Sequence, residues 1–356
     1  MDTRAAELAS KLAEEHALAL FEYGYLAARL GDAELRDELA SLARAVREPI
    51  YGHGVFIRGL IEFSSFCTND CLYCGLRASN AACERYRLEP EQILACTEQG
   101  YSLGFRTFVL QSGEDPQYSD ERLCAIVSAI KGAHPDCAVT LSVGERTRES
   151  YRLLREAGVD RYLLRHETAD PAHYARLHPA SMSWDRRMRC LYDLRDLGYA
   201  VGCGFMVGSP YQTPAALARD LAFIQEFRPE MCGIGPFVPH HATPFADRPS
   251  GTLEQTLGLL SIIRLIHPFV LLPATTALAT IDPCGRELGM EAGANVAMPN
   301  LSPAGVRTRY ALYDGKACTG DEAAECRRDL DRSLESFGYR VVIDRGDPRG
   351  VTRGQA

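Results

Sequence analysis

The sequence of 356 residues predicts a complete (β/α)8 TIM barrel with an N-terminal helical extension and a C-terminal segment that closes the barrel. Two observations predict this fold. Eight short apolar runs alternate with helical patterns from about residue 55 onward, as parallel strands joined by helices do. The repeats end near residue 300, which fits the usual size of a closed barrel. A doubly wound open sheet is the alternative.

The chain divides into three predicted parts. Residues 1–50 have apolar positions at three- and four-residue spacing and no glycine before Gly24, which predicts a helical extension. Residues 51–300 contain the alternating repeats and form the predicted barrel. Residues 301–356 form a C-terminal segment that becomes a polar tail after about residue 345.

The predicted strands are apolar runs bounded by glycine, proline and polar residues. In order they are GLIEFSSF, TFVLQSG, AVTLSVG, RYLLRHE, AVGCGFMVG, MCGIGPF, FVLLPATT and NVAMP. Helices are predicted between them near 90–102, 119–132, 147–157, 184–197, 214–227, 253–266 and 283–291. Since active sites of such barrels lie at the carboxyl ends of the strands, the polar residues that follow each run are the functional candidates.

The composition excludes several classes of protein. A formal net charge of −8 argues against a nucleic-acid partner. The most apolar stretch, IHPFVLLPATTALATI, contains two prolines and a histidine and is too short to span a bilayer, so we expect no membrane association. No secretory signal opens the chain, which predicts a cytoplasmic protein. The 13 cysteines are scattered, and a reducing compartment disfavours a disulfide framework.

Three cysteines lie within the stretch FCTNDCLYCGLR. Cys67, Cys71 and Cys74 have the spacing Cys-x3-Cys-x2-Cys, and turn-forming residues separate the first two. Three thiolates can hold three irons of a [4Fe–4S] cluster and leave the fourth iron open to a ligand. A structural zinc site would need a fourth ligand, for which Cys83 is the candidate, and this is the alternative.

The motif, with Tyr73 before its last cysteine, resembles that of the radical S-adenosylmethionine superfamily. Further segments are similar to the HydE family of [FeFe]-hydrogenase maturases and occur in order over about residues 55–316. They are IEFSSFCTNDCLYCGLR, VLQSGEDP, TLSVGE, RYLLRHETA, GFMVGSPYQT, GIGPFVPH, PATTA and GANVAMPN. The resemblance implies a [4Fe–4S] cluster whose open iron chelates S-adenosylmethionine. It also implies reductive cleavage of that cofactor to methionine and a 5′-deoxyadenosyl radical.

The fourth predicted strand, RYLLRHE, carries the most charge. The two-residue repeat of a strand places Arg161, Leu163, Arg165 and Glu167 on one face. Charges along a barrel strand are costly unless they have partners, so this face predicts either a ligand cavity or an internal salt-bridge network. The resemblance implies that Glu167 receives the ammonium group of S-adenosylmethionine and that Arg187 binds its carboxylate.

Other residues are assigned by the resemblance, although several also read as ordinary turn or buried hydroxyl residues. It implies that the S-adenosylmethionine site also contains Tyr73, Gln111, Ser112, Ser142 and His178. It implies a substrate cavity that contains Thr140, Arg161, Arg165, Thr275, Thr276, Met298 and Tyr313.

The chain departs from the HydE pattern at three places. His178 stands where an arginine is frequent. Only Cys318 and Cys326 match the three C-terminal cysteines that hold an accessory cluster in some members, and Asp329 replaces the third. Gly305 and Val306 replace residues that are more often proline and tyrosine, whereas Tyr310 and Tyr313 are kept.

The resemblance implies a function in assembly of the [FeFe]-hydrogenase active site. The implied substrate is an organometallic iron–cysteine species with CO and cyanide, the implied partners are the maturases HydG and HydF, and the implied electron donor is a ferredoxin or flavodoxin. Two rival functions remain open. One is a related C–S bond-forming enzyme or mutase of the biotin synthase or methylornithine synthase type, and the other is a non-catalytic iron–sulfur carrier.

Overall fold

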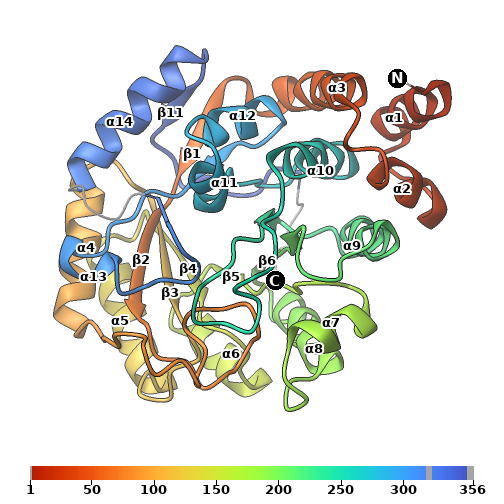
Figure 1. The fold of residues 1–356 in the computed structure, drawn as a ribbon. Helices are drawn as coiled ribbons and strands as arrows, with labels where there is room; N and C mark the ends of the chain where they lie inside the picture. The colour runs from red at the N-terminus through yellow and green to blue at the C-terminus, as the bar shows by residue number, and fades with distance from the viewer. Residues whose placement is uncertain (1, 318–322, 351–356) are drawn as a thin grey trace.

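A computed structural model describes residues 2–317 and 323–350 (Figure 1). The helices are α1 (Thr3–Glu15), α2 (Leu20–Ala27), α3 (Ala33–Tyr51), α4 (Pro90–Ser102), α5 (Asp120–Ala133), α6 (Arg148–Glu156), α7 (Pro171–Leu177), α8 (Trp184–Asp196), α9 (Pro214–Phe227), α10 (Leu253–Ile266), α11 (Thr276–Ile281), α12 (Gly285–Glu291), α13 (Ala304–Arg307) and α14 (Ala323–Ser336). The strands are β1 (Gly54–Ile57), β2 (Gly59–Ser64), β3 (Thr107–Ser112), β4 (Ala138–Ser142), β5 (Arg161–Leu163), β6 (Ala200–Cys203), β7 (Met206–Val207), β8 (Met231–Cys232), β9 (Gly235–Pro236), β10 (Val296–Ala297) and β11 (Arg340–Val342).

The central sheet is parallel and returns to its starting strand. Six strands pair in the order β2-β3-β4-β5-β6-β8. Parallel bridges then join Met231 to Leu271, Pro273 to Val296, and Asn300 to Leu60 in β2. The pairing therefore runs through eight strand positions, and the predicted (β/α)8 barrel is confirmed. Residues 269–276 contribute bridging pairs instead of a regular strand, and the expected strand 200–208 divides into β6 and β7.

Helices cover the outside of the barrel, and their starts follow from the sequence. Ser119, Thr147, Ser183, Thr213 and Thr252 each accept a backbone N–H bond at the first turn of a helix. Such caps satisfy donors that have no partner inside the helix. The seven helices expected between strands correspond to α4, α5, α6, α8, α9, α10 and α12. The helical N-terminal residues form α1–α3, of which α3 packs on α10 and α2 on α9 (Figure 1).

The apolar core lies between the strands and the helices. In β5, Tyr162 points outward and packs edge-to-face against Tyr151 and Tyr199. His166, two positions beyond Leu164, is fully buried and packs against Phe223 of α9. Tyr162 and His166 thus face the helices, which leaves Arg161 and Arg165 for the barrel interior, as the alternation predicts.

The C-terminal residues close the amino ends of the barrel strands. The strand β11 pairs in parallel with β1, so residues 340–342 extend the wall of the barrel. The chain then crosses the end of the barrel, where the guanidinium of Arg161 donates to the carbonyls of Arg345 and Gly346 at 2.7 and 3.1 Å. The same guanidinium forms an ion pair with Asp347 at 2.8 Å. This end of the barrel is therefore filled by the protein itself.

Candidate active site

A cavity of about 320 Å³ lies at the carboxyl ends of the strands. Residues from the cysteine loop, from the ends of β3, β4 and β5, and from the segment after α13 line it together. Its position is the one at which barrel enzymes bind their ligands. The side chains that carry charge in its wall are Glu62, Glu114, Arg165, Glu167, Arg187 and Lys316.

The loop that contains the three cysteines is held by its own polar side chains. Arg77 donates two hydrogen bonds to Asp70, at 2.8 and 2.6 Å. Arg85 donates to the carbonyl oxygens of residues 65, 76, 77 and 80. Asn80 donates to the carbonyl oxygen of Gly75 at 2.7 Å. A guanidinium that serves four carbonyls fixes the loop without any regular secondary structure.

The three thiols are not arranged as the ligands of a single metal ion. Within the described residues, the only three histidine, cysteine or carboxylate ligands whose atoms all lie within 4.8 Å of one another are His240, His241 and Asp314. Around one zinc ion, sulfur atoms would lie about 3.8 Å apart. The three thiols, with or without Cys83, do not meet that condition, and this argues against the zinc alternative.

Burial raises the pKa of the motif thiols, that of Cys74 to about 12. Such thiols give up their protons when a positively charged metal group binds them. The backbone N–H of Glu114 points at the sulfur of Cys67 at 3.4 Å, an orientation that suits a cluster thiolate. Gly113 permits this approach, because a Cβ there would lie 2.3 Å from the carbonyl oxygen of Phe66 and 2.5 Å from the Cβ of Cys67. The residues therefore fit a [4Fe–4S] cluster.

The side chain of His178 orients Tyr73 from behind the cavity wall. Its hydroxyl lies 3.2 Å from Nε2 of His178. Nδ1 of His178 lies 3.0 Å from the carbonyl oxygen of Tyr174, so Nδ1 carries the proton and Nε2 accepts from Tyr73. Burial lowers the pKa of His178 to about 3, which keeps the ring neutral. His178 itself does not line the cavity, whereas Tyr73 does.

Glu167 presents an unpaired carboxylate oxygen beside the cysteine loop. It follows β5 with a positive φ of 62°, an uncommon conformation for a residue with a side chain. Its Oε2 atom is buried and has no hydrogen-bond partner among the described residues. Burial raises the pKa of this carboxyl group, although the charge of Arg165 opposes the shift. A buried, unpaired carboxylate in a cavity wall fits a cationic ligand group such as an ammonium.

Arg187 supplies the matching positive charge. It lies in the first turn of α8, is 6% exposed, and lines the same cavity as Glu167. Its Nη1 donates to the carbonyl oxygen of Arg165 at 2.7 Å. One carboxylate and one guanidinium therefore face the space beside the three thiols. This arrangement fits the ammonium and carboxylate groups of a bound amino acid.

Comparison with known proteins agrees with this geometry. The profile of the Radical SAM superfamily matches residues 61–224. The chain is 43% identical over 322 residues to the [FeFe] hydrogenase maturase subunit HydE of Thermotoga maritima, with 90% of this chain and 92% of that protein covered. The chain belongs to the HydE family of the radical S-adenosylmethionine superfamily. Members of the superfamily use a [4Fe–4S] cluster and S-adenosylmethionine, for which the three thiols, Glu167 and Arg187 are suitably placed.

More distant relatives share the fold of this HydE-family chain. The 3-methylornithine synthase of Methanosarcina barkeri is 29% identical over 312 residues, which cover 86% of this chain and 84% of that protein. The crystal structure of methylornithine synthase (PylB) superposes with a TM-score of 0.83 at 27% identity, covering 94% and 97% of the two chains. The structure of HydG superposes with a TM-score of 0.78 at 21% identity, covering 96% of this chain and 76% of that one.

Most of the residues predicted from the sequence meet in the cavity of this HydE-family chain. The cavity is lined by Cys67, Tyr73, Cys74, Gln111, Ser112, Ser142, Arg165, Glu167, Arg187, Thr275, Thr276, Met298 and Tyr313. Cys71 lies just behind this wall, with its sulfur 3.7 Å from the sulfur of Met182.

Two expected cavity residues lie elsewhere. Arg161 and Thr140 are paired in the β4–β5 register and are both buried, but neither lines the cavity. The guanidinium of Arg161 binds Thr107 and the C-terminal residues, so it closes the barrel and does not line the cavity. The prediction for these two residues therefore needs correction. The alternation that placed Arg161 inside the barrel was right, but it did not show at which end the side chain would be used.

A polar cluster at the far side of the cavity was not predicted from the sequence. Glu62 accepts from Asn300 at 2.8 Å and forms an ion pair with Lys316. Tyr310 lies close by, with its hydroxyl 3.4 Å from Nε2 of Gln111. Lys316 and Tyr310 come from the segment between α13 and α14, of which only Tyr313 was predicted to line the cavity.

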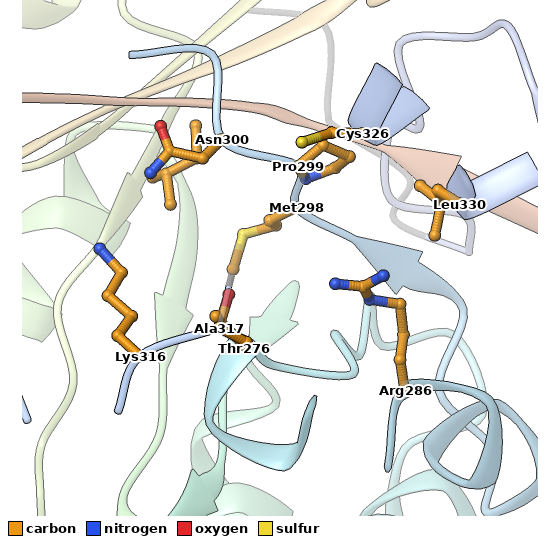
Figure 2. Close-up of a pocket in the computed structure, with 10 residues that line it drawn as sticks. Thr276, Arg286, Met298, Pro299, Asn300, Lys316, Ala317, Cys326 and Leu330 are labelled. Carbon is orange, nitrogen blue, oxygen red and sulfur yellow. The ribbon is translucent and has the colours of Figure 1, made fainter. Parts of the chain in front are cut away.

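A second, smaller pocket adjoins the cavity and shares Leu60, Thr276, Met298 and Lys316 with it. Figure 2 shows this pocket, with Lys316 pointing toward Asn300 and with Arg286 and Leu330 on the other side.

Among residues 2–317 and 323–350, none of the helices combines the length and the apolar character that a bilayer span requires.

Proposed function

We propose that this protein is a cytoplasmic radical S-adenosylmethionine enzyme that acts in assembly of the [FeFe]-hydrogenase active site. The observation that carries the proposal is the unpaired carboxylate oxygen of Glu167 in a cavity that also contains the cysteine loop and Arg187. The 43% identity to a HydE protein over most of both chains favours this function over the mutase and biotin synthase alternatives.

The cluster would be held by Cys67, Cys71 and Cys74. When both are bound, the reduced cluster supplies the electron that cleaves S-adenosylmethionine to methionine and a 5′-deoxyadenosyl radical. Glu167 would accept hydrogen bonds from the ammonium group, and Arg187 would donate to the carboxylate. A site of this kind is not needed by a non-catalytic iron–sulfur carrier.

The remaining cofactor residues would bind the rest of S-adenosylmethionine. They are Tyr73, Gln111, Ser112 and Ser142, with His178 acting behind Tyr73. Because these side chains come from four different strand ends or loops, the cofactor would be enclosed on several sides. Enclosure keeps water and unwanted hydrogen donors from a reactive radical.

The substrate would occupy the part of the cavity beyond the cofactor. We propose an organometallic iron–cysteine species with CO and cyanide, bound near Arg165, Thr275, Thr276, Met298 and Tyr313. A guanidinium and three hydroxyl groups suit an anionic, polar ligand. HydG would supply this species, HydF would receive the product, and a ferredoxin or flavodoxin would supply the electron.

A reconstitution experiment tests the proposal. Anaerobically purified protein with its cluster is combined with S-adenosylmethionine, reductant, HydG, HydF and apo-hydrogenase, and hydrogen evolution is measured. We expect hydrogenase activity that depends on this protein and on S-adenosylmethionine. Formation of methylornithine from lysine or of biotin from dethiobiotin would support the rival enzymes. Absence of 5′-deoxyadenosine in every mixture would support a carrier.

A further inference from the structure

Glu145 lies directly behind Arg187 and is not itself part of the cavity wall. Its Oε1 atom accepts from Nε of Arg187 at 2.7 Å. Its other carboxylate oxygen lies 3.1 Å from Nε of Arg186, the neighbouring residue in α8. The side chains of Arg187 and Glu145 are 7% and 8% exposed, so the pair is shielded from water. A shielded charge-assisted bond of this length holds its partners firmly.

Two of the three guanidinium nitrogens of Arg187 are thereby engaged. Glu145 holds Nε, and the carbonyl oxygen of Arg165 accepts from Nη1 at 2.7 Å. Among the described residues, Nη2 makes no hydrogen bond, and Arg187 lines the cavity. Since a guanidinium is planar, fixing Nε and Nη1 fixes the direction of the remaining N–H groups. They are left for a ligand in the cavity.

The backbone at the end of β4 is shaped to deliver Glu145 to this position. Gly144 has a φ of 78°, and a Cβ at this residue would lie 2.1 Å from Cγ of Glu114. Only glycine fits both the conformation and the space. The turn that follows points the N–H of Glu145 at Oε1 of Glu114, at 2.7 Å. Glu145 is therefore held through its backbone as well as through its side chain.

We propose that Glu145 is a positioning residue that orients Arg187 toward the carboxylate of S-adenosylmethionine. The inference rests on the proposed function, because it takes that molecule as the ligand of Arg187. Glu145 contributes to binding only when the ligand has a carboxylate for Arg187 to hold. A residue that merely supported the fold would affect ligands with and without the carboxylate alike.

The test compares two ligands on the cluster-loaded protein and its Glu145→Gln variant. Isothermal titration calorimetry gives the Kd of S-adenosylmethionine and of decarboxylated S-adenosylmethionine. The glutamine keeps the size of the side chain but loses its charge. We expect the Kd of S-adenosylmethionine to rise about tenfold, as loss of one charge-assisted hydrogen bond predicts. The Kd of the decarboxylated ligand should change less than about twofold.

Controls separate this inference from the proposed function. The Glu149→Gln variant, in which an exposed partner of Arg152 is changed, should bind both ligands as the wild type does. In an Arg187→Leu background, Glu145→Gln should have no further effect. If Glu145→Gln fails to take up its cluster, Glu145→Asp, which keeps the charge but shortens the side chain, carries the same comparison. An equal loss for both ligands, or no loss for either, overturns the inference. A wild-type protein that does not bind S-adenosylmethionine overturns the proposed function instead.

Discussion

Lys316 and Glu62 form a buried ion pair that joins the segment after α13 to the strand that precedes the cysteine loop. The side chains are 8% and 1% exposed. Lys316 also donates to the carbonyl oxygen of Tyr310, and Asn300 donates to the second oxygen of Glu62. Both side chains line the cavity. The ion pair therefore holds the closing segment against β2 and also places two charges in the cavity wall.

Removing one member of this pair should loosen the closing segment. In Lys316→Met, the Glu62 carboxylate stays buried without its cation, which costs about 3 kcal/mol of the free energy of unfolding. Urea denaturation of the cluster-loaded protein measures this loss, and hydrogen exchange should accelerate in residues 310–317. Adding Glu62→Gln should recover most of the stability. A double variant as unstable as Lys316→Met alone would contradict the pairing. Arg152→Met, which breaks an exposed pair, should leave the urea midpoint unchanged.

The sequence predicted the barrel well because its signals are local. Alternating apolar runs and capped helices repeat along residues 55–300, and each was read from its own residues. The strand-end residues that line the cavity, such as Gln111 and Glu167, followed from the same rule about carboxyl ends. The parts that were missed depend on distant contacts. Arg161 and Asp347 are 186 positions apart, and Glu62 and Lys316 are 254 apart.

The positive charges of Arg161 and Arg165 alone did not indicate which of the two lines the cavity. Arg161 and Arg165 lie on the same face of one strand, and the sequence offers no sign that the C-terminal residues bind one of them. The ion pair of Glu145 with Arg187 was not predicted for a similar reason. Its contact with Arg187 depends on the turn at Gly144, whose direction comes from packing against Glu114.

The cluster assignment predicts the behaviour of Cys71→Ser. Anaerobically reconstituted wild-type protein should bind about four irons and, when reduced, produce 5′-deoxyadenosine from S-adenosylmethionine. The serine variant should lose both properties, because a hydroxyl is a poor ligand for an iron–sulfur cluster. Iron analysis measures the cluster content, and chromatography measures the 5′-deoxyadenosine that is formed. Cys124→Ser, which changes a cysteine outside the motif, is the matched control. Cleavage retained in Cys71→Ser would refute the assignment.

The two arginines of β5 and its extension should respond differently to the same substitution. Arg165→Leu removes a cation from the cavity wall, so we expect hydrogenase maturation to fall at least tenfold while S-adenosylmethionine binding changes less. Arg161→Leu leaves the carbonyls of Arg345 and Gly346 without their donor, which should lower the free energy of unfolding by about 2 kcal/mol. Maturation assays and urea denaturation on both variants test the contrast. Identical profiles for the two variants would contradict the separation of cavity and barrel end.

His178 should make stability depend on pH. Burial lowers its pKa to about 3 from an ordinary value of 6.5. Between these values the unfolded chain binds a proton that the folded protein does not, so stability is lost as pH falls. From pH 6.5 to 5 the loss is about 2 kcal/mol. In His178→Leu this contribution disappears, so the unfolding free energy should depend less on pH over that range. Equal pH dependence in variant and wild type would refute the shift.

Comparison with a second buried histidine, His267, separates an effect on stability from an effect on S-adenosylmethionine binding. Burial also lowers the pKa of His267 to about 3, and its neighbours are Arg228 and Arg264, away from the cavity. His267→Leu should flatten the pH dependence of stability as His178→Leu does. Only His178→Leu should weaken S-adenosylmethionine binding, by about fivefold, because Tyr73 loses the acceptor of its hydroxyl. Calorimetric titration at pH 7.5 measures this difference.

The C-terminal cysteines should be dispensable. Cys318 lies outside the described residues, whereas Cys326 lines the small pocket beside Arg286 and Leu330 (Figure 2). Asp329, which stands where a third ligand is expected, is half exposed and pairs with Arg332 on the surface of α14. A carboxylate is also a poor substitute for a thiolate in iron–sulfur clusters. In the described part of the chain, Asp329 is therefore already paired and does not stand free as a third ligand.

The double variant Cys318→Ser, Cys326→Ser should consequently keep its maturation activity and its iron content. Iron analysis, the electron paramagnetic resonance spectrum of the reduced protein and the maturation assay are compared with those of the wild type. Cys67→Ser, measured in parallel, should lose the iron of the motif cluster and shows that the assays respond. If the double variant loses both about two irons and its maturation activity, a second cluster exists. In that case Asp329→Ala, which removes the residue in the position of the third cysteine, should produce the same loss.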